Sequence, residues 1–441
     1  MISEAVPAQT LSVEGPVSPI QARLRVPGDK SISHRAAMLG GIAEGTTRIR
    51  NFLPANDCLA TLDVVRGLGV EVEYRGDEVL VHGRGMNGLM EPPRPLECGG
   101  SGTTMRLMSG LLAGQPFYSV LVGNAQLSRR PMDRVARPLR EMGATILGRE
   151  GGRLAPLSIQ GGNLKAISYR PPVASAQIKS TVLLAGLFAS GETTVEEPTA
   201  TRDHTERMLK AMGADLKVDG SVVRVRQSRL KAIDVNVPGD ISSAAFILAA
   251  AAIVPGSRII VEGVGVSPGR TGFLHALKRM GAEVRLHNEH ESHGEPVADV
   301  EVSFASLMGI SVSAEDVPGM IDELPLLAVV ATQAEGITEV RGAAELRVKE
   351  TDRIATTAAE LTSMGAHIEP LPDGFRVHGP TPLSGARVSS QGDHRLAMSL
   401  SIAALVAKGL TTVEDTECAD DSFPGFGALL RTLIEGGPGG E

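Results

Sequence analysis

The sequence predicts an α/β protein of two lobes, in which buried helices are surrounded by sheets and outer helices. Three observations predict this fold. Two short phrases recur along the 441 residues and divide the chain into six units of comparable length. Each unit joins an almost wholly apolar helix to an amphipathic helix and to alternating strand patterns. The phrase Val-Pro-Gly-Asp occurs at 26–29 and again at 237–240, and it would divide the units three and three.

The first recurring phrase is a glycine followed by Thr or a similar residue and then by alternating apolar positions. Its six glycines are spaced 65 to 80 residues apart, with the copy near Gly114 the loosest: Gly45, Gly114, Gly191, Gly256, Gly336 and Gly409. The second phrase reads GLGVEV at 67–72 and Met-Gly-Ala in four later copies, for example at 212–214. Self-similarity at a fixed period indicates repeated supersecondary units.

Each unit predicts the order α, β, α, β, β. The first helix, for example 175–189 or 242–254, is apolar on all sides and should be buried. We expect the glycine of the first phrase to end this helix in a left-handed cap. A strand and an amphipathic helix follow, and the second glycine ends that helix. Turn signals at 75–77, 219–220 and 373–374 then predict hairpins.

The two Val-Pro-Gly-Asp phrases allow two interpretations. If the chain crosses between lobes there, one lobe is 25–238 and the other combines 1–24 with 239–441. Pro and Gly suit such a sharp crossover. The phrase is equally explained as a repeated way of starting an inner helix.

Composition limits the function. The chain is 42% hydrophobic, and 43 Lys and Arg against 51 Asp and Glu give a net charge of −8, which argues against nucleic acid or an anionic membrane as partner. Three widely separated cysteines suggest neither a zinc site nor a disulfide framework. The first 19 residues lack the pattern of a signal peptide, and the apolar stretch at 244–254 is too short to span a bilayer. We therefore expect a cytoplasmic protein, and we also expect a monomer.

Polar residues gather where the predicted inner helices begin. The starting segments are GDKSISHR at 28–35, GGSGTTMR at 99–106, SAQIKS at 175–180, GDISS at 239–243, DELP at 322–325 and GDHR at 392–395. Converging helix N-termini would bind an anion. Ordinary N-capping explains any one of these segments. It explains less well the charged side chains on buried helices, which need a partner: Lys30, Arg35, Arg106 and Arg395.

Charges also mark the predicted starts of outer helices, at 129–131, 201–203 and 348–353. Taken alone, KETDR at 349–353 is best interpreted as a solvated helix face carrying a weak Glu350–Arg353 ion pair. GDKS is not a phosphate-binding P-loop, because Asp29 stands where that motif requires Gly. His82, His275 and His378 are interpreted as surface or packing residues.

Taken together, these segments resemble the 5-enolpyruvylshikimate-3-phosphate (EPSP) synthase family. The segments that carry the resemblance lie in the family's order between 27 and 398: PGDKSISHRA, GGSGTTMRL, NAQLSRRPMDR, SAQIKS, TRDHTERML, MIDELPLLA, RVKETDR and GDHRLAM. The resemblance implies a two-lobed inside-out α/β barrel of six βαβαββ repeats, three per lobe. It also implies that inner-helix N-termini face an interlobe cleft.

The resemblance further implies the reaction and its ligands. The family transfers the enolpyruvyl group of phosphoenolpyruvate to the 5-hydroxyl of shikimate 3-phosphate and releases phosphate, a step of aromatic amino acid biosynthesis. It uses no metal and no organic cofactor. Glyphosate inhibits the family by occupying the phosphoenolpyruvate pocket, so we expect inhibition here.

Site residues follow from the resemblance position by position. Lys30, Ser31 and Arg35 match the first-helix site; Ser175, Ala176, Gln177 and Arg202 match shikimate 3-phosphate contacts; Asp322 and Lys349 match contacts to its ring hydroxyls; and Gly102, Arg130, Arg353 and Arg395 match the phosphoenolpyruvate pocket. Asp322 is the expected base and Glu350 the expected proton donor, with Lys30 as the alternative donor.

Two positions depart from the family pattern. Gly100 replaces the Asn of the usual GNAGT phrase, and Asp421 stands where many members have a Lys that helps to hold phosphoenolpyruvate. Two alternatives remain at this point. A UDP-N-acetylglucosamine enolpyruvyl transferase would carry a loop Cys shortly before an Arg-Pro, which GNAQLSRRP lacks. A non-catalytic polyanion-binding protein is disfavoured because both Asp322 and Glu350 are present.

Overall fold

The computed structural model describes residues 9–76 and 78–436, which form two compact units. Unit 2 comprises Gly28–Pro238 and Glu291–Pro296, and unit 1 comprises the chain up to Pro27, Gly239–His290 and the residues from Val297 onward. Each unit has its own hydrophobic core. None of the helices within the described residues is both long and apolar enough to cross a membrane.

Unit 2 contains three open sheets among its described residues, in the strand orders β14-β3-β5-β4, β6-β7-β9-β8 and β10-β11-β13-β12, with β15 also paired to β3. Its helices are α1 (Lys30–Ile42), α2 (Asn56–Gly67), α3 (Gly102–Ala113), α4 (Asp133–Glu141), α5 (Arg149–Gly152), α6 (Ala176–Gly186) and α7 (His204–Ala211), with the short helix η1 (Leu127–Arg129). Its strands are β3 (Ala43–Arg50), β4 (Glu71–Arg75), β5 (Glu78–Arg84), β6 (Leu96–Glu97), β7 (Tyr118–Val122), β8 (Thr145–Gly148), β9 (Leu154–Gln160), β10 (Ser168–Tyr169), β11 (Glu192–Glu196), β12 (Leu216–Asp219), β13 (Val222–Arg226), β14 (Leu230–Lys231) and β15 (Asp234–Asn236).

Unit 1 likewise contains three open sheets among its described residues, ordered β2-β16-β18-β17, β19-β20-β22-β21 and β1-β24-β23. Its helices are α8 (Ile241–Ile253), α9 (Gly272–Arg279), α10 (Leu324–Ala331), α11 (Arg353–Ser363), α12 (His394–Ala404) and α13 (Phe426–Ile434), with η2 (Val317–Gly319), η3 (Ala344–Val348) and η4 (Thr416–Asp421). Its strands are β1 (Leu11–Gly15), β2 (Gln21–Arg25), β16 (Arg258–Gly265), β17 (Glu283–Ser292), β18 (Glu295–Ser303), β19 (Ser311–Val312), β20 (Gly336–Val340), β21 (His367–Leu371), β22 (Gly374–Gly379), β23 (Arg387–Ser389) and β24 (Gly409–Glu414).

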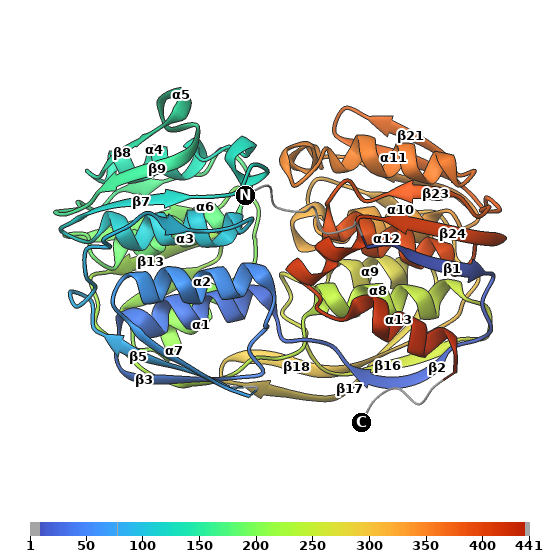
Figure 1. Cartoon of the computed structure of the whole chain (residues 1–441), viewed down its shortest axis with the longest axis horizontal. Coiled ribbons are helices and arrows are strands. Elements are labelled where there is room, and N and C mark those ends of the chain that lie inside the picture. The colour runs from blue at the N-terminus through green and yellow to red at the C-terminus, as the bar shows by residue number, and fades with distance from the viewer. Residues whose placement is uncertain (1–8, 77, 437–441) are drawn as a thin grey trace, which may run out of the picture. The chain divides into compact units, whose positions relative to one another are not determined.

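Four inner helices lie between the two strands of a parallel pair along the chain. The parallel pairs β6–β7, β10–β11, β19–β20 and β23–β24 are connected through α3, α6, α10 and α12 respectively. A parallel pair needs such a crossover, whereas the neighbouring antiparallel pairs need only a hairpin. Figure 1 shows these helices inside their own unit. The prediction of an α/β fold is confirmed.

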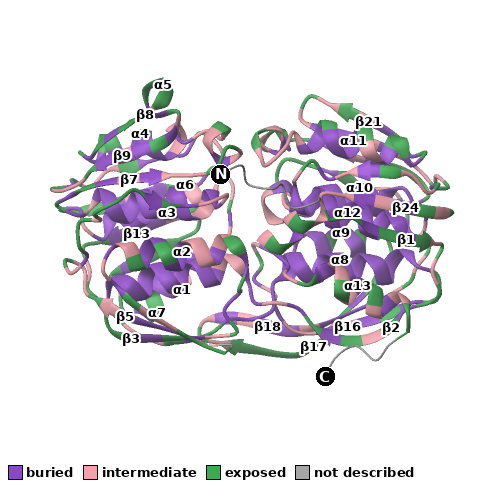
Figure 2. Cartoon of the chain, in the orientation of Figure 1, coloured by how far each residue is buried: buried purple, intermediate pink, exposed green. Residues whose placement is uncertain are grey.

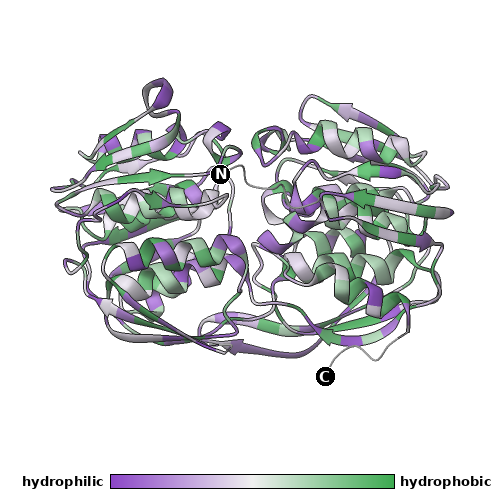
Figure 3. Ribbon diagram, viewed as in Figure 1, coloured by the Kyte–Doolittle hydropathy of each residue, from purple (hydrophilic) through white to green (hydrophobic). Residues whose placement is uncertain are grey.

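Burial follows the hydropathy of the inner helices. Every residue of α8 and of α10 is buried (Figure 2), and both helices are strongly apolar in Figure 3. In unit 1 these two helices pack against each other and against α12, while α3 packs against α6 in unit 2. Helices with an apolar surface on all sides belong in such a position.

The recurring glycines adopt positive φ angles except Gly114, the C-cap of α3 at φ −83°, and not all of them cap a helix. Gly365 has φ 92° and directly follows Met364, the C-cap of α11, so it ends an outer helix as predicted. Gly45 has φ 103° but lies inside β3, after α1 has already ended at Ile42. The expectation of a left-handed cap on the inner helix is therefore wrong at Gly45, because this glycine turns the chain within the strand that follows. Gly114 does end the inner helix α3, but in the right-handed conformation.

The two Val-Pro-Gly-Asp phrases start inner helices and also contain the unit boundaries. Asp29 caps α1 by accepting a hydrogen bond from the Ile32 amide, and Asp240 caps α8 by accepting one from the Ser242 amide. The tip of the β17–β18 hairpin belongs to unit 2, where Glu295 Oε1 lies 2.8 Å from His204 Nδ1 on α7. The sequence pattern did not predict this placement of the hairpin tip.

Candidate functional site

Most predicted site residues of unit 2 lie at the starts of its inner helices, whereas Arg130 follows η1 and Arg202 precedes α7. Lys30 is the first residue of α1, and its Nζ lies 2.5 Å from Asp57 Oδ2 on α2. Both side chains are largely covered, at 15% and 13% exposure. The α1 N-terminus and the ammonium group place positive charge together, and Asp57 partly neutralises it. This is an electrostatic environment in which an anion can bind.

Arg35 lies one turn further along α1 and is buried. Its Nε donates to Thr205 Oγ1 at 2.6 Å and its NH2 group to Ser180 Oγ at 2.9 Å. Burial lowers the pKa of Arg35 to about 10, opposed by the carboxylates of Glu206 and Asp29. The guanidinium therefore stays charged at neutral pH, held by hydroxyls rather than by a direct carboxylate partner in these bonds.

Gln177 joins α6 to α3. Its Nε2 donates to Thr103 Oγ1 at 3.0 Å, and its Oε1 accepts from Arg106 NH1 at 2.8 Å. Ser175 caps α6 by accepting from the Ile178 amide, and Ala176 is the first residue of that helix. These contacts place Ser175, Ala176 and Gln177 at one helix start, as the sequence predicts.

Gly102 begins α3 beside two arginines. A Cβ added to Gly102 would lie 2.8 Å from Arg106 NH1 and 3.2 Å from Arg130 NH1. The missing side chain thus allows two guanidinium groups to approach the N-terminus of a helix.

Arg202 follows β11 and is half-buried. Its positive charge further lowers the pKa of Arg35, so Arg202 lies near the α1 site.

The predicted residues of unit 1 meet around the guanidinium of Arg353. Its side chain is 2% exposed, and three carboxylates contact it. Arg353 NH2 lies 2.6 Å from Glu350 Oε2, Arg353 NH1 lies 3.5 Å from Asp322 Oδ1, and Arg353 Nε lies 2.8 Å from Asp393 Oδ2. Burial alone would lower the pKa of Arg353, but Asp393, Glu350 and Asp322 together raise it above its ordinary value.

Asp322 also binds a second cation. Its Oδ1 accepts from Lys349 Nζ at 3.2 Å. Asp322 stands immediately before Glu323, the N-cap of α10, so it precedes the helix rather than opening it. The arrangement brings two half-buried carboxylates, Asp322 and Glu350, to one buried guanidinium.

Arg395 differs from the other arginines. It is 6% exposed and lies in the first turn of α12, with its guanidinium carbon 5.9 Å from the ring centroid of Phe246. Within the described part of the chain, its side chain has no hydrogen bond or carboxylate partner. A nearly buried cation at a helix N-terminus without a counter-ion fits an anionic ligand.

The interpretation of KETDR as a solvated helix face is wrong. Lys349 and Glu350 precede α11, which begins at Arg353 after the N-cap Asp352. The Glu350–Arg353 pair is buried on its arginine side. The segment is a turn that directs charged side chains inward, which spacing on a helix could not reveal.

Sequence reasoning missed the residues that hold the predicted cations. Asp57 binds Lys30, Asp393 binds Arg353, and Thr205 with Ser180 binds Arg35. All four are distant in sequence from the side chain they hold. The sequence does draw attention to Asp393, because this residue lies in the helix-start segment GDHR, but there it predicts only a helix cap.

Metal-binding geometry is absent from these groups. Two clusters of His and Glu side chains among the described residues lie close enough to hold an ion. Both clusters are on sheets and include none of the predicted site residues.

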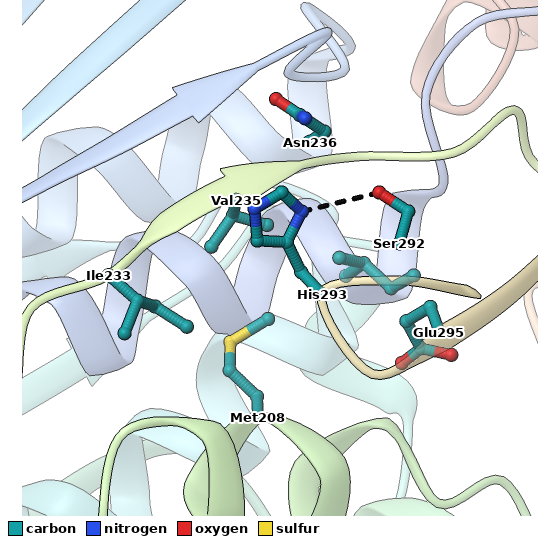
Figure 4. A pocket seen from close by; sticks show the side chains of 8 residues that line it. Met208, Ile233, Val235, Asn236, Ser292, His293 and Glu295 are labelled. Atoms are coloured by element: carbon teal, nitrogen blue, oxygen red, sulfur yellow. Dashed lines mark hydrogen bonds between the residues drawn. The ribbon is translucent and has the colours of Figure 1, made fainter.

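A small pocket in unit 2 is distinct from the predicted site residues and from both clusters. It is largely apolar, with Met208, Ile233 and Val235 on one side and Ser292 and His293 of the hairpin tip on the other (Figure 4).

Comparison with known proteins identifies the family. The sequence model of EPSP synthase (3-phosphoshikimate 1-carboxyvinyltransferase) matches residues 15–430. This chain belongs to the EPSP synthase family. A 3-phosphoshikimate 1-carboxyvinyltransferase of Brevibacillus brevis is 52% identical over 417 residues, covering 94% of this chain and 98% of the relative. One of Desulforudis audaxviator is 53% identical over 420 residues, covering 95% and 98%.

Solved structures agree with this membership. EPSP synthase from Acinetobacter baumannii superposes with a TM-score of 0.85 at 45% identity, covering 96% of this chain and 98% of that structure. The enolpyruvyl transferase NikO from Streptomyces tendae superposes with a TM-score of 0.75 at 19% identity, covering 98% and 97%, and shows a common fold only. The resemblance that the sequence motifs predicted is confirmed.

Proposed function

We propose that this EPSP synthase family member is a 3-phosphoshikimate 1-carboxyvinyltransferase. It transfers the enolpyruvyl group of phosphoenolpyruvate to the 5-hydroxyl of shikimate 3-phosphate and releases phosphate. The observation that carries the proposal is the meeting of Asp322, Glu350 and Lys349 around the buried Arg353, in a chain of this family. These groups supply a base, an acid and two cations, which are the functions that the reaction requires.

Arginine forks suit the two anionic substrates. Phosphoenolpyruvate carries a carboxylate and a phosphate, and guanidinium groups bind both through paired hydrogen bonds. We assign Gly102, Arg130, Arg353 and Arg395 to phosphoenolpyruvate. Arg395 supports this assignment most directly, because it is nearly buried and no carboxylate of the described residues binds it. Glyphosate, itself an anion, would compete at the same groups.

To bind shikimate 3-phosphate, the protein needs groups that donate hydrogen bonds to the phosphate and groups that accept hydrogen bonds from the ring hydroxyls. We assign Ser175, Ala176, Gln177 and Arg202 to the phosphate side, and Asp322 and Lys349 to the ring hydroxyls. The capped start of α6 supports the first assignment, since amides and a hydroxyl are available there. Lys30, Ser31 and Arg35 form the first-helix site, with Lys30 serving both substrates.

The proposed chemistry is an addition followed by an elimination. Asp322 takes the proton of the 5-hydroxyl of shikimate 3-phosphate, and the oxygen of that hydroxyl bonds to the enol carbon of phosphoenolpyruvate. Glu350 gives a proton to the methylene carbon of phosphoenolpyruvate. Glu350, now a carboxylate, then takes a proton back from the resulting methyl group, the carbon–oxygen bond to phosphate breaks, and the double bond is restored. Lys30 is the alternative donor. The contact of Lys349 Nζ with Asp322 Oδ1 at 3.2 Å supports the assignment of both residues to the ring hydroxyls, because it holds the two side chains together.

The finer architecture follows the same proposal. We propose that the six sheets belong to an inside-out α/β barrel of six βαβαββ repeats, three in each lobe, with lobes of 25–238 and 1–24 plus 239–441. Three sheets support this, because each has a parallel pair joined through an inner helix and an antiparallel hairpin beside it. The sheet β1-β24-β23 has the parallel pair, but its antiparallel strand β1 comes from the other end of the chain. We further propose a cytoplasmic monomer that needs no metal or organic cofactor.

Phosphate release tests the activity. With both substrates present, we expect release of one phosphate per product, and no release when either substrate is omitted. UDP-N-acetylglucosamine offered with phosphoenolpyruvate should give none. Binding of both substrates without turnover would instead indicate the non-catalytic alternative and overturn the assignment.

A further inference from the structure

We propose that unit 1 carries a zinc site on the exposed face of the β21–β22 hairpin, formed by His367, Glu369 and His378. The three side chains come from the first and third positions of β21 and from β22, where His367 and His378 are register partners. One ligand atom from each side chain lies within 4.8 Å of the others. Two imidazoles and one carboxylate are a ligand set that Zn²⁺ accepts, with water in the fourth position. This inference does not rest on the proposed function.

The distances already approach those of a metal centre. Tetrahedral zinc with ligand bonds of ~2.0–2.1 Å places its ligand atoms about 3.3 Å apart. His378 Nε2 and Glu369 Oε1 are 3.4 Å apart. The His367 ring is stacked on the His378 ring, with centroids 4.3 Å apart and planes 17° from parallel. A rotation of the exposed His367 ring is therefore the main movement that binding requires.

The ligand atoms are available for a cation. His378 Nε2 is covered from solvent and forms no hydrogen bond with the described residues, although Glu369 is near it. His367 has no side-chain hydrogen bond or ion pair within the described part of the chain, and its ring is stacked on the His378 ring. Each of these two neighbouring imidazoles therefore has a nitrogen that can bind a metal ion.

Arg376 does not block the site. Its guanidinium lies 2.6 Å from Glu339 Oε2, which is its close partner, and 3.5 Å from Glu369 Oε2. Glu369 Oε1, the oxygen that faces His378, is not used by Arg376. One oxygen of Glu369 can thus face an arginine while the other faces zinc.

A second cluster in unit 2 provides a contrast. Glu71, Glu73 and His82 occupy the same kind of positions on β4 and β5, with Glu71 and His82 as register partners. There, however, both ring nitrogens of His82 are engaged, Nε2 by Glu73 at 2.8 Å and Nδ1 by Thr46 at 3.0 Å. Glu73 is also bound by Arg75. One engaged imidazole and two carboxylates are a poorer zinc site.

The proposed site lies away from the Arg353 groups. Arg353 is the first residue of α11, while His367 begins the strand that follows the end of this helix. Eleven residues of α-helix span roughly 16 Å. Figure 1 shows α11 and β21 next to each other in unit 1. Zinc at this hairpin should therefore join β21 to β22 without changing the proposed catalytic groups.

Zinc titration of the full chain tests the proposal. After removal of metal with a chelator, ZnCl₂ is titrated at pH 7.5 by calorimetry, and Co²⁺ is used as a spectroscopic substitute. We expect one Zn²⁺ to bind per chain. We also expect bound Co²⁺ to give a visible absorption spectrum typical of nitrogen ligands. His367→Gln and His378→Gln should each weaken binding by at least ~100-fold, because loss of outer-shell partners alone costs 10–100-fold. The matched control His82→Gln should bind zinc as the wild type does.

Thermal unfolding provides the second measurement. Each variant is unfolded without metal to verify that it folds, and then with zinc, which should raise Tm only where the site is intact. Affinity should fall as the pH is lowered, because protons compete with zinc for the imidazole nitrogens. No zinc binding by the wild type would overturn the proposal. Equal binding by wild type and His378→Gln, or loss of binding in His82→Gln, would also overturn it.

Discussion

Asp393 holds the guanidinium of Arg353 through two hydrogen bonds, from Nε at 2.8 Å and from NH2 at 3.1 Å. The same carboxylate accepts the Arg395 amide at 2.9 Å as the N-cap of α12. Asp393 is fully buried. Asp393 therefore fixes Arg353 and also caps the helix that carries Arg395, and both arginines are assigned to phosphoenolpyruvate. We call Asp393 a positioning residue for this reason.

Replacement of Asp393 by Asn should separate these two roles. Asn still caps a helix, but it removes a charge from a buried pair. We expect the KM for phosphoenolpyruvate to rise on the order of tenfold, with a smaller change for shikimate 3-phosphate. The free energy of unfolding should fall by roughly 3 kcal/mol, as when one partner of a buried pair is removed.

Steady-state kinetics with each substrate varied in turn, together with denaturant unfolding, would measure both effects. Thr351→Val is the matched control, since Thr351 only adds a bond of 3.2 Å to Asp393 Oδ2. A merely structural role would lower stability but leave the two KM values in their original ratio. An unchanged KM for phosphoenolpyruvate would contradict positioning of Arg353 by Asp393.

Replacement of Asp322 by Asn tests the proposed base. The shape is retained while the proton acceptor is lost, and a positioned base typically contributes 10²–10⁴-fold to the rate. We expect kcat to fall by about that factor, with shikimate 3-phosphate affinity changed far less. Asp373→Asn, in the exposed β21–β22 turn, serves as control and should leave kcat unchanged. If kcat of Asp322→Asn stays within about threefold, Asp322 is not the base.

His34 predicts a pH dependence of stability. It is fully buried on α1, with Nδ1 2.6 Å from Thr61 Oγ1. Burial, reinforced by Lys30 and Arg35, holds the pKa of His34 well below its ordinary value of 6.5. The unfolded chain gains a proton at this residue below pH 6.5, while the folded chain does not. The stability that neutral His34 contributes is therefore present above pH 6.5 and is lost as the pH falls, by ~1.4 kcal/mol per pH unit.

Thermal unfolding between pH 5 and 8 would measure this loss. His34→Gln should flatten the decrease in Tm below pH 6.5, while His275→Gln, an exposed histidine on α9, should retain it. The same slope in wild type and His34→Gln would mean that other groups cause the acid sensitivity.

Local patterns predicted the helix starts better than the contacts made there. The apolar inner helices and the outer helix that ends at Gly365 are set by nearby residues, so periodicity and turn chemistry found them. The KETDR segment was misassigned because its charges are buried by long-range contacts with Asp322 and Asp393. The partners Asp57, Thr205 and Ser180 escaped for the same reason, since one sequence contains no record of which distant side chains meet.

Gly102 makes the protein's predicted sensitivity to glyphosate depend on a single missing methyl group. An added Cβ would lie 2.8 Å from Arg106 NH1 and 3.2 Å from Arg130 NH1, closer than side-chain carbons normally approach. Both arginines would have to shift, and Arg130 is assigned to phosphoenolpyruvate. The family resemblance links Ala at this position with tolerance, so glyphosate should be displaced more than the substrate. A change of one methyl group in a tight pocket is typically worth about 10–200-fold.

Inhibition constants against phosphoenolpyruvate would therefore be measured for wild type and Gly102→Ala. We expect competitive inhibition in the wild type and an inhibition constant on the order of tenfold or more higher in the variant, with a smaller rise in KM. Gly100→Ala is the matched control from the same turn, since its added carbon would meet Asn124 Nδ2 at 3.2 Å and neither arginine. Equal inhibition constants in wild type and Gly102→Ala would exclude Gly102 as the cause of sensitivity. Equal increases in both variants would assign the effect to the turn as a whole rather than to the arginines, because only the Gly102 carbon approaches them.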